Sequence, residues 1–151
     1  MSTRVEPADW MAEGLWQRFR LIALVIDRED RFVAGPEEAE PTSEAPGHEV
    51  ERAAEELVLR SIRVGTESVN FSILRELSKD VTIAFSDLMG VTGLDRLTLG
   101  ERVNDLIQVG LATKDVETRS VSGTRAAAGL LSLVDETRES LVQKIRKGDD
   151  T

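Results

Sequence analysis

Residues 85–111 read FSDLMGVTGLDRLTLGERVNDLIQVGL, and a tight turn followed by a helix is predicted within them. Gly93 suits a turn residue with a positive φ angle, because glycine adopts that conformation without a steric penalty. The helix is predicted over residues 95–109, and its apolar side chains recur at helical spacing. The residues that this spacing places on one buried face are Leu99, Val103 and Leu106.

Two residues compete to begin this predicted helix. Asp95 can accept hydrogen bonds from the first free amide groups of the helix. Thr98 and Glu101 form an alternative capping box, which would start the helix one turn later. The sequence alone leaves both starts open.

The region from Ser68 to Arg146 resembles the winged helix-turn-helix of bacterial and archaeal regulators of the ArsR and MarR type. The resemblance rests on three short motifs at the family's spacing: Asp87-Leu88, Gly93-Leu94-Asp95 and Gly110-Leu111. It implies, in chain order, a first helix at 71–78, a short strand at 81–83, a supporting helix and turn at 85–95, a recognition helix at 95–109, a wing at 112–131 and a closing helix at 133–146. The wing is expected to consist of strands at 112–118 and 124–131 around a polar turn at 119–123.

A winged helix presents its recognition helix to the major groove of DNA and its wing to the adjacent backbone. The resemblance therefore implies a function as a DNA-binding transcriptional regulator. The residues expected to contact DNA are Arg96, Thr98, Arg102 and Asn104 from the recognition helix, and Lys114, Arg119 and Arg125 from the wing. Arginine can bind guanine and asparagine can bind adenine, whereas the wing cations can hold phosphates. Arg96 and Arg102 are expected to flank one exposed face of the helix.

Several side chains of the predicted recognition helix are unusual for a DNA contact. Leu97 stands where the family usually has a polar residue, and Gly100 offers no side chain. Glu101 and Asp105 would repel phosphate. Because a fold does not determine a function, a winged-helix protein-interaction adaptor without DNA binding stays open as the alternative.

The net charge of −9 is itself unusual for a nucleic-acid-binding protein, whose affinity normally depends on Lys and Arg. The acidic residues are unevenly distributed along the chain. Residues 1–65 hold 8 basic and 14 acidic side chains, a net charge of −6, whereas residues 66–147 sum to about −1. The charge deficit therefore lies mainly outside the predicted DNA-binding region.

The chain is predicted to be mainly α, of the α+β class, with an additional helical segment before the winged helix. The predicted divisions are an aromatic N-terminal segment at 1–34, an acidic Pro/Glu-rich linker at 35–48, the winged helix-turn-helix at 49–147 and a tail at 148–151. Within the first segment a helix is expected from about Ala8 to Asp27, although Leu21–Ile26 alone fits a strand equally well. Helical periodicity resumes at Glu49 and is expected to stop at Gly65.

A homodimer is expected, because a single helix-turn-helix contacts too few base pairs for useful specificity. Its predicted interface combines the aromatic N-terminal helix with the closing helix around Val134, Leu141 and Ile145. Double-stranded DNA and a second copy are thus the expected partners, with a protein partner under the adaptor alternative.

Other classes of function have little support in the sequence. There is no cysteine, no phosphate-binding glycine loop and no nucleophile paired with a base, so enzyme activity, a cofactor and a metal are not expected. The sequence contains neither a secretory signal pattern nor an apolar run long enough to span a bilayer. A cytoplasmic protein without a membrane segment is expected.

Overall fold

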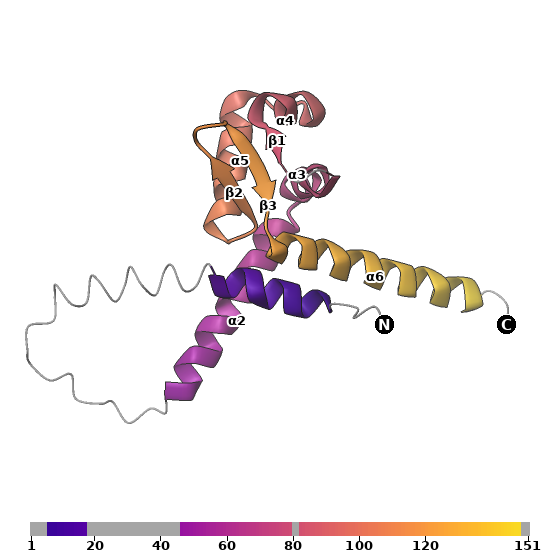
Figure 1. Ribbon diagram of the computed structural model, residues 1–151. Helices are drawn as coiled ribbons and strands as arrows, with labels where there is room; N and C mark the ends of the chain where they lie inside the picture. The colour runs from indigo at the N-terminus through magenta and orange to yellow at the C-terminus, as the bar shows by residue number, and fades with distance from the viewer. Residues whose placement is uncertain (1–5, 18–45, 80–81, 149–151) are drawn as a thin grey trace, which may run out of the picture.

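The computed structural model describes residues 6–17, 46–79 and 82–148, and most of them are helical (Figure 1). One small antiparallel sheet interrupts the helices, so the mainly α, α+β composition is confirmed. The elements are a helix over 7–17, α2 (Pro46–Gly65), α3 (Ser68–Lys79), β1 (Ile83–Ala84), α4 (Phe85–Thr92), α5 (Arg96–Gln108), β2 (Ala112–Asp115), β3 (Ser120–Gly123) and α6 (Arg125–Gly148).

The turn between α4 and α5 has the predicted chemistry. Gly93 closes α4 with φ 71°, and its amide donates to the Met89 carbonyl oxygen at 2.9 Å. The Asp95 carboxylate accepts a hydrogen bond from the Thr98 amide at 2.7 Å, so α5 begins at Arg96. The alternative start of the helix at Thr98 and Glu101 is therefore wrong, because the helix begins one turn earlier with Asp95 as its cap.

The three strands form a sheet in the order β1-β3-β2, with both pairs antiparallel. The central strand pairs Val121 with Ile83 on one side and with Lys114 on the other. β2 and β3 form a hairpin whose turn covers residues 116–119. The Asp115 carboxylate supports this turn by accepting hydrogen bonds from two of its amide groups, those of Glu117 and Thr118.

The predicted second wing strand at 124–131 is wrong, and the predicted turn at 119–123 is mostly β3. Residues 125–131 instead form the beginning of α6, eight residues before the expected start of the closing helix. Thr124 caps this helix, since its hydroxyl oxygen accepts a hydrogen bond from the Ala127 amide at 3.3 Å. Alanines follow Thr124 and favour a helix. The first strand is also displaced, to Ile83–Ala84 from the expected 81–83.

Small residues at the start of α6 let the N-terminal helix pack directly against it. A Cβ atom added at Gly129 would lie 2.5 Å from the Pro7 carbonyl oxygen, and one added at Gly14 would lie 2.5 Å from the Ala126 amide nitrogen. Met11 and Leu15 are buried in this contact region. The N-terminal helix, expected at a dimer interface, thus finds a packing surface within its own chain.

The core combines side chains from helices and strands that are far apart in the sequence. Its largest fully buried side chains come from α3, α4, α5, the segment before β2, β3 and α6: Ile73, Leu74, Leu88, Leu99, Val103, Leu106, Leu111, Val121 and Leu130. α2 ends at Gly65 as predicted, where a side chain would collide with Leu111 and Leu130. The core therefore holds α5 and the hairpin in one fixed arrangement.

Two boundaries of the predicted domains fall differently or lie outside the described residues. α2 begins at Pro46, so the last three residues of the expected linker at 35–48 are helical. Three predicted segments lie outside the described residues. They are the rest of that linker, residues 18–27 of the expected aromatic helix, which include Leu21–Ile26, and residues 149–151 of the tail. Over the ranges that are described, no helix is both long and apolar enough to cross a membrane.

Candidate nucleic-acid interface

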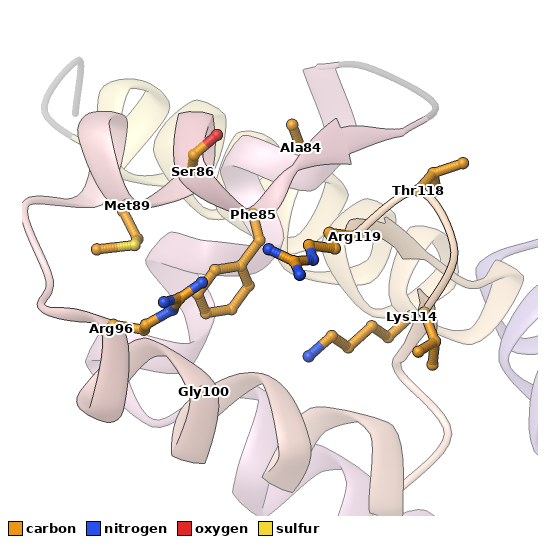
Figure 2. Close-up of a pocket in the computed structure, with 10 residues that line it drawn as sticks. Ala84, Phe85, Ser86, Met89, Arg96, Gly100, Lys114, Thr118 and Arg119 are labelled. Atoms are coloured by element: carbon orange, nitrogen blue, oxygen red, sulfur yellow. The ribbon is translucent and has the colours of Figure 1, made fainter.

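A hollow of about 600 Å³ lies between the first turn of α5, the hairpin and the start of α4 (Figure 2). We call it the cationic hollow. Its ten lining residues include three basic side chains and no acidic one: Ala84, Phe85, Ser86, Met89, Arg96, Gly100, Lys114, Val116, Thr118 and Arg119. The chain as a whole has 28 acidic and 19 basic residues, so the hollow reverses the charge balance of the protein.

The three cations come from different elements and converge on the Phe85 ring. Arg96 is the first residue of α5, Lys114 belongs to β2, and Arg119 directly precedes β3. Figure 2 shows all three side chains directed toward the space around Phe85. The Lys114 ammonium nitrogen lies 5.3 Å from the centroid of that ring, a cation–π distance.

The backbone fixes the position of Arg119. Its φ angle is 51°, a left-handed conformation that is uncommon for a residue with a side chain. Its carbonyl oxygen accepts a hydrogen bond from the Phe85 amide at 2.8 Å. The end of the hairpin turn is therefore tied to the start of α4, beside the hollow that Arg119 lines.

None of these three cations forms an ion pair with any residue that the structure describes. The Asp115 carboxylate, next to Lys114 in sequence, accepts hydrogen bonds from amide groups of the hairpin turn. The Asp95 carboxylate, next to Arg96, is used as the cap of α5. Its pKa is lowered, first of all by the hydrogen bond from the Thr98 amide, so the group is ionised at neutral pH. Because Asp95 already satisfies the start of α5, an anion in the hollow would depend on the side-chain cations.

A second hollow of about 620 Å³ continues along α5. It shares Phe85, Arg96, Gly100 and Lys114 with the first, so the two form neighbouring parts of one surface. Its remaining lining residues are Leu97, Glu101, Val103, Asn104 and Ile107. This part of the surface is more apolar, and it holds one carboxylate.

The structure brings four of the seven expected DNA contacts to this surface. Arg96, Lys114 and Arg119 line the cationic hollow, and Asn104 lines the second hollow with an exposed side chain. Thr98 lines neither hollow among the residues described, and its amide is occupied by Asp95.

Arg102 does not lie with Arg96 at this surface, because it lines neither hollow. The two positions are about 120° apart around the helix, as expected from their spacing. The shorter arc between them, however, contains the buried residues Leu99, Val103 and Leu106. Arg102 therefore lies on the opposite edge of the core from Arg96, where it binds the Glu67 carboxylate at 2.6 Å.

The assignment of Arg125 to the wing is also wrong. Arg125 is the first residue of α6, and its guanidinium binds the Glu13 carboxylate of the N-terminal helix at 2.6 Å. The error follows from the misplaced second strand, since residues 124–131 were expected to extend the wing. The role of Arg125 in the described structure is to join two helices.

Phe85 and Gly100 line both hollows although neither was an expected contact. Phe85 was assigned only to the supporting helix, and nothing in a single sequence indicates that its ring would lie under Lys114. Gly100 was counted against DNA binding because it lacks a side chain, yet it lines both hollows. A Cβ atom added there would meet no atom within 4 Å, so packing does not require glycine.

The described ranges contain no group of three or more His, Cys, Asp or Glu residues that could hold a metal ion. Comparisons of the chain with protein-family models, curated proteins and solved structures found no match. The geometry and charge of this surface therefore provide the evidence for a function.

Proposed function

We propose that this protein is a winged helix-turn-helix regulator that binds double-stranded DNA through α5 and the β2–β3 hairpin. The order of elements from α3 to β3, with a three-stranded antiparallel sheet, agrees with the arrangement that the resemblance implies. The observation that carries the proposal is the cationic hollow, in which Arg96, Lys114 and Arg119 meet without a carboxylate.

The dimensions of α5 also support this proposal. The helix has 13 residues and is about 20 Å long, and the major groove of DNA, about 12 Å wide, admits a helix. On its exposed side, Asn104 has the two-pronged amide that pairs with adenine. The hairpin lies beside the first turn of α5, where the adjacent DNA backbone would pass (Figure 1).

A homodimer is part of the proposal, with α6 as its main interface. The C-terminal part of α6 extends beyond the rest of the described chain, as Figure 1 shows. Its apolar residues there are largely exposed, including Leu141 at 55% and Ile145 at 57%. A second copy covering this stripe would bury apolar area and place two α5 helices on successive half-sites.

A protein-interaction adaptor is the second candidate, and two exposed apolar side chains favour it. Leu97 on α5 is 73% exposed and Val116 in the hairpin turn is 81% exposed. They lie at the edges of the same surface, since each lines one of the two hollows. Apolar anchors of this kind are common in protein interfaces, whereas backbone phosphates would not bind them.

A titration of labelled random-sequence duplex with the purified full chain tests the DNA proposal. Fluorescence anisotropy at about 50 mM and about 200 mM salt gives the salt dependence of the affinity. We expect binding at the lower salt and a logarithmic slope of about −1 or steeper, because each phosphate held by the cations releases about one counterion. No binding at the lower salt, together with capture of a protein partner that Leu97→Ser abolishes, would favour the adaptor.

A further inference from the structure

Gly100 occupies an unfavourable place for a glycine. It lies inside α5, and glycine destabilises the interior of a helix relative to alanine. Neither a positive φ angle nor a close neighbour explains it, because its φ is not in the left-handed range and a Cβ atom would meet nothing within 4 Å. The missing side chain leaves open space where the two hollows meet.

The cationic hollow has the chemistry of a phosphate site. Arg96 and Arg119 offer planar guanidinium groups that can bind phosphate oxygens in pairs, and Lys114 adds a point charge. No carboxylate lines the hollow, so a bound anion would meet no repulsion from its walls. Phe85 supports the Lys114 ammonium group without neutralising it, because an aromatic ring carries no net charge.

We propose that the cationic hollow receives one phosphate group of the DNA backbone and that Gly100 is the opening through which the strand approaches. A side chain at position 100 would stand between an incoming strand and the three cations, since Gly100 shares the hollow with all of them. This inference rests on the proposed function and adds that Arg96 contacts phosphate instead of a base.

Gly90 provides a matched control for this assignment. It lies in α4, another helix, and a Cβ atom added there would also meet nothing within 4 Å. Gly90 lines neither of the two hollows. The variants Gly100→Gln and Gly90→Gln thus make the same chemical change at open helical sites, and only the first would obstruct the hollow.

The test measures binding of both full-length variants to the random duplex by fluorescence anisotropy at low salt. We expect Gly100→Gln to weaken binding about tenfold or more and to reduce the salt slope by about one ion, while Gly90→Gln stays within about twofold of the wild type. Thermal unfolding should show that both variants are at least as stable as the wild type, because glutamine favours a helix more than glycine does. Equal binding by both variants and the wild type would overturn the inference and leave the proposed function standing.

A second arm separates backbone phosphate from free phosphate. Inorganic pyrophosphate is titrated into isotope-labelled protein, and the amide signals of Gly100 and Lys114 are followed by NMR. If the wild type binds no duplex but pyrophosphate shifts these signals and Lys114→Gln abolishes the shift, the proposed function fails while the hollow remains a phosphate site for a small ligand. If neither duplex nor pyrophosphate binds, the hollow is not a phosphate site.

Discussion

Two sets of cations in this protein have opposite environments. In the paired set, Arg75 binds Asp135, Arg102 binds Glu67 and Arg125 binds Glu13, with shortest distances of 2.5 to 2.6 Å. In the unpaired set, which lines the cationic hollow, Arg96, Lys114 and Arg119 have no such partner among the described residues. Basic side chains thus have two different environments in this protein, because their position decides whether a carboxylate lies nearby.

The paired set lies where separate segments of the chain meet. Arg75 joins α3 to α6, Arg102 joins α5 to the α2–α3 connection, and Arg125 joins α6 to the N-terminal helix. The unpaired set lines an open hollow instead. We therefore expect the first set to affect stability and the second to affect binding.

The largest effect is expected from removing the unpaired set. The triple variant Arg96→Gln, Lys114→Gln, Arg119→Gln should lose on the order of 100-fold in duplex affinity at low salt, because it removes all three cations that would hold the phosphate group. Fluorescence anisotropy measures the loss. The matched control neutralises the paired set, Arg75, Arg102 and Arg125, and changes the net charge by the same amount. Equal losses in the two triples would mean that overall charge, not the hollow, governs binding.

Removing Arg75 alone should have the next largest effect, on stability. Its guanidinium forms two hydrogen bonds with Asp135, at 2.5 and 2.9 Å, and lies 4.9 Å from the centroid of the Phe71 ring. Arg75→Gln should lower the free energy of unfolding by about 1 to 2 kcal/mol, since the pair is bidentate yet partly exposed. Urea denaturation tests this, and an unchanged midpoint would show that the pair contributes nothing. Duplex binding should stay unchanged.

The same ion pair predicts a dependence of stability on pH. The pKa of Asp135 is lowered, chiefly by the hydrogen bond from Arg75. A carboxylate with a lowered pKa in the folded state stabilises the protein above its unfolded pKa of about 4, and this contribution disappears as the pH falls through the folded value. The difference in melting temperature between the wild type and Asp135→Asn should therefore be constant above about pH 5 and shrink in more acidic solution. A difference that grows on acidification would contradict this assignment.

The smallest effect is expected at Arg102. Its side chain is 35% exposed and that of Glu67 is 40% exposed, so solvent screens the pair. Arg102→Gln should reduce the free energy of unfolding by about 0.5 kcal/mol and leave duplex affinity within about twofold of the wild type. Denaturation and anisotropy on one preparation measure both. A loss of affinity clearly greater than twofold would show that Arg102 contacts DNA.

Local features of the fold were predictable because they depend on residues a few positions apart. The turn at Gly93 and the end of α2 at Gly65 follow the expected positions. The helical arithmetic for Arg96 and Arg102 was also correct, and the apolar positions between them contained the information that they lie on opposite edges of the core. The partner of Arg102, Glu67, is 35 positions away and could not be identified from spacing.

The sequence at the start of α6 contains a local signal for a helix. Thr124 followed by alanines is typical of a capped helix, but the expected wing assigned this segment to a strand. Gly14 and Gly129 let the N-terminal helix approach α6. This role could not be predicted from the sequence, because the two segments are more than a hundred positions apart. The partner of Arg125, Glu13, is 112 positions away and could not be identified for the same reason.

The helices α3, α4 and α5, the turn before α5 and the buried face of α5 follow from the sequence alone, since backbone preferences and apolar periodicity act over short distances. The pairing of some cations with carboxylates, and the availability of others, depends on the packed structure. Arg96, Lys114 and Arg119 meet because β3 pairs with both β1 and β2 and the Phe85 amide binds the Arg119 carbonyl group. Such contacts depend on how the whole core packs, and no local pattern contains them.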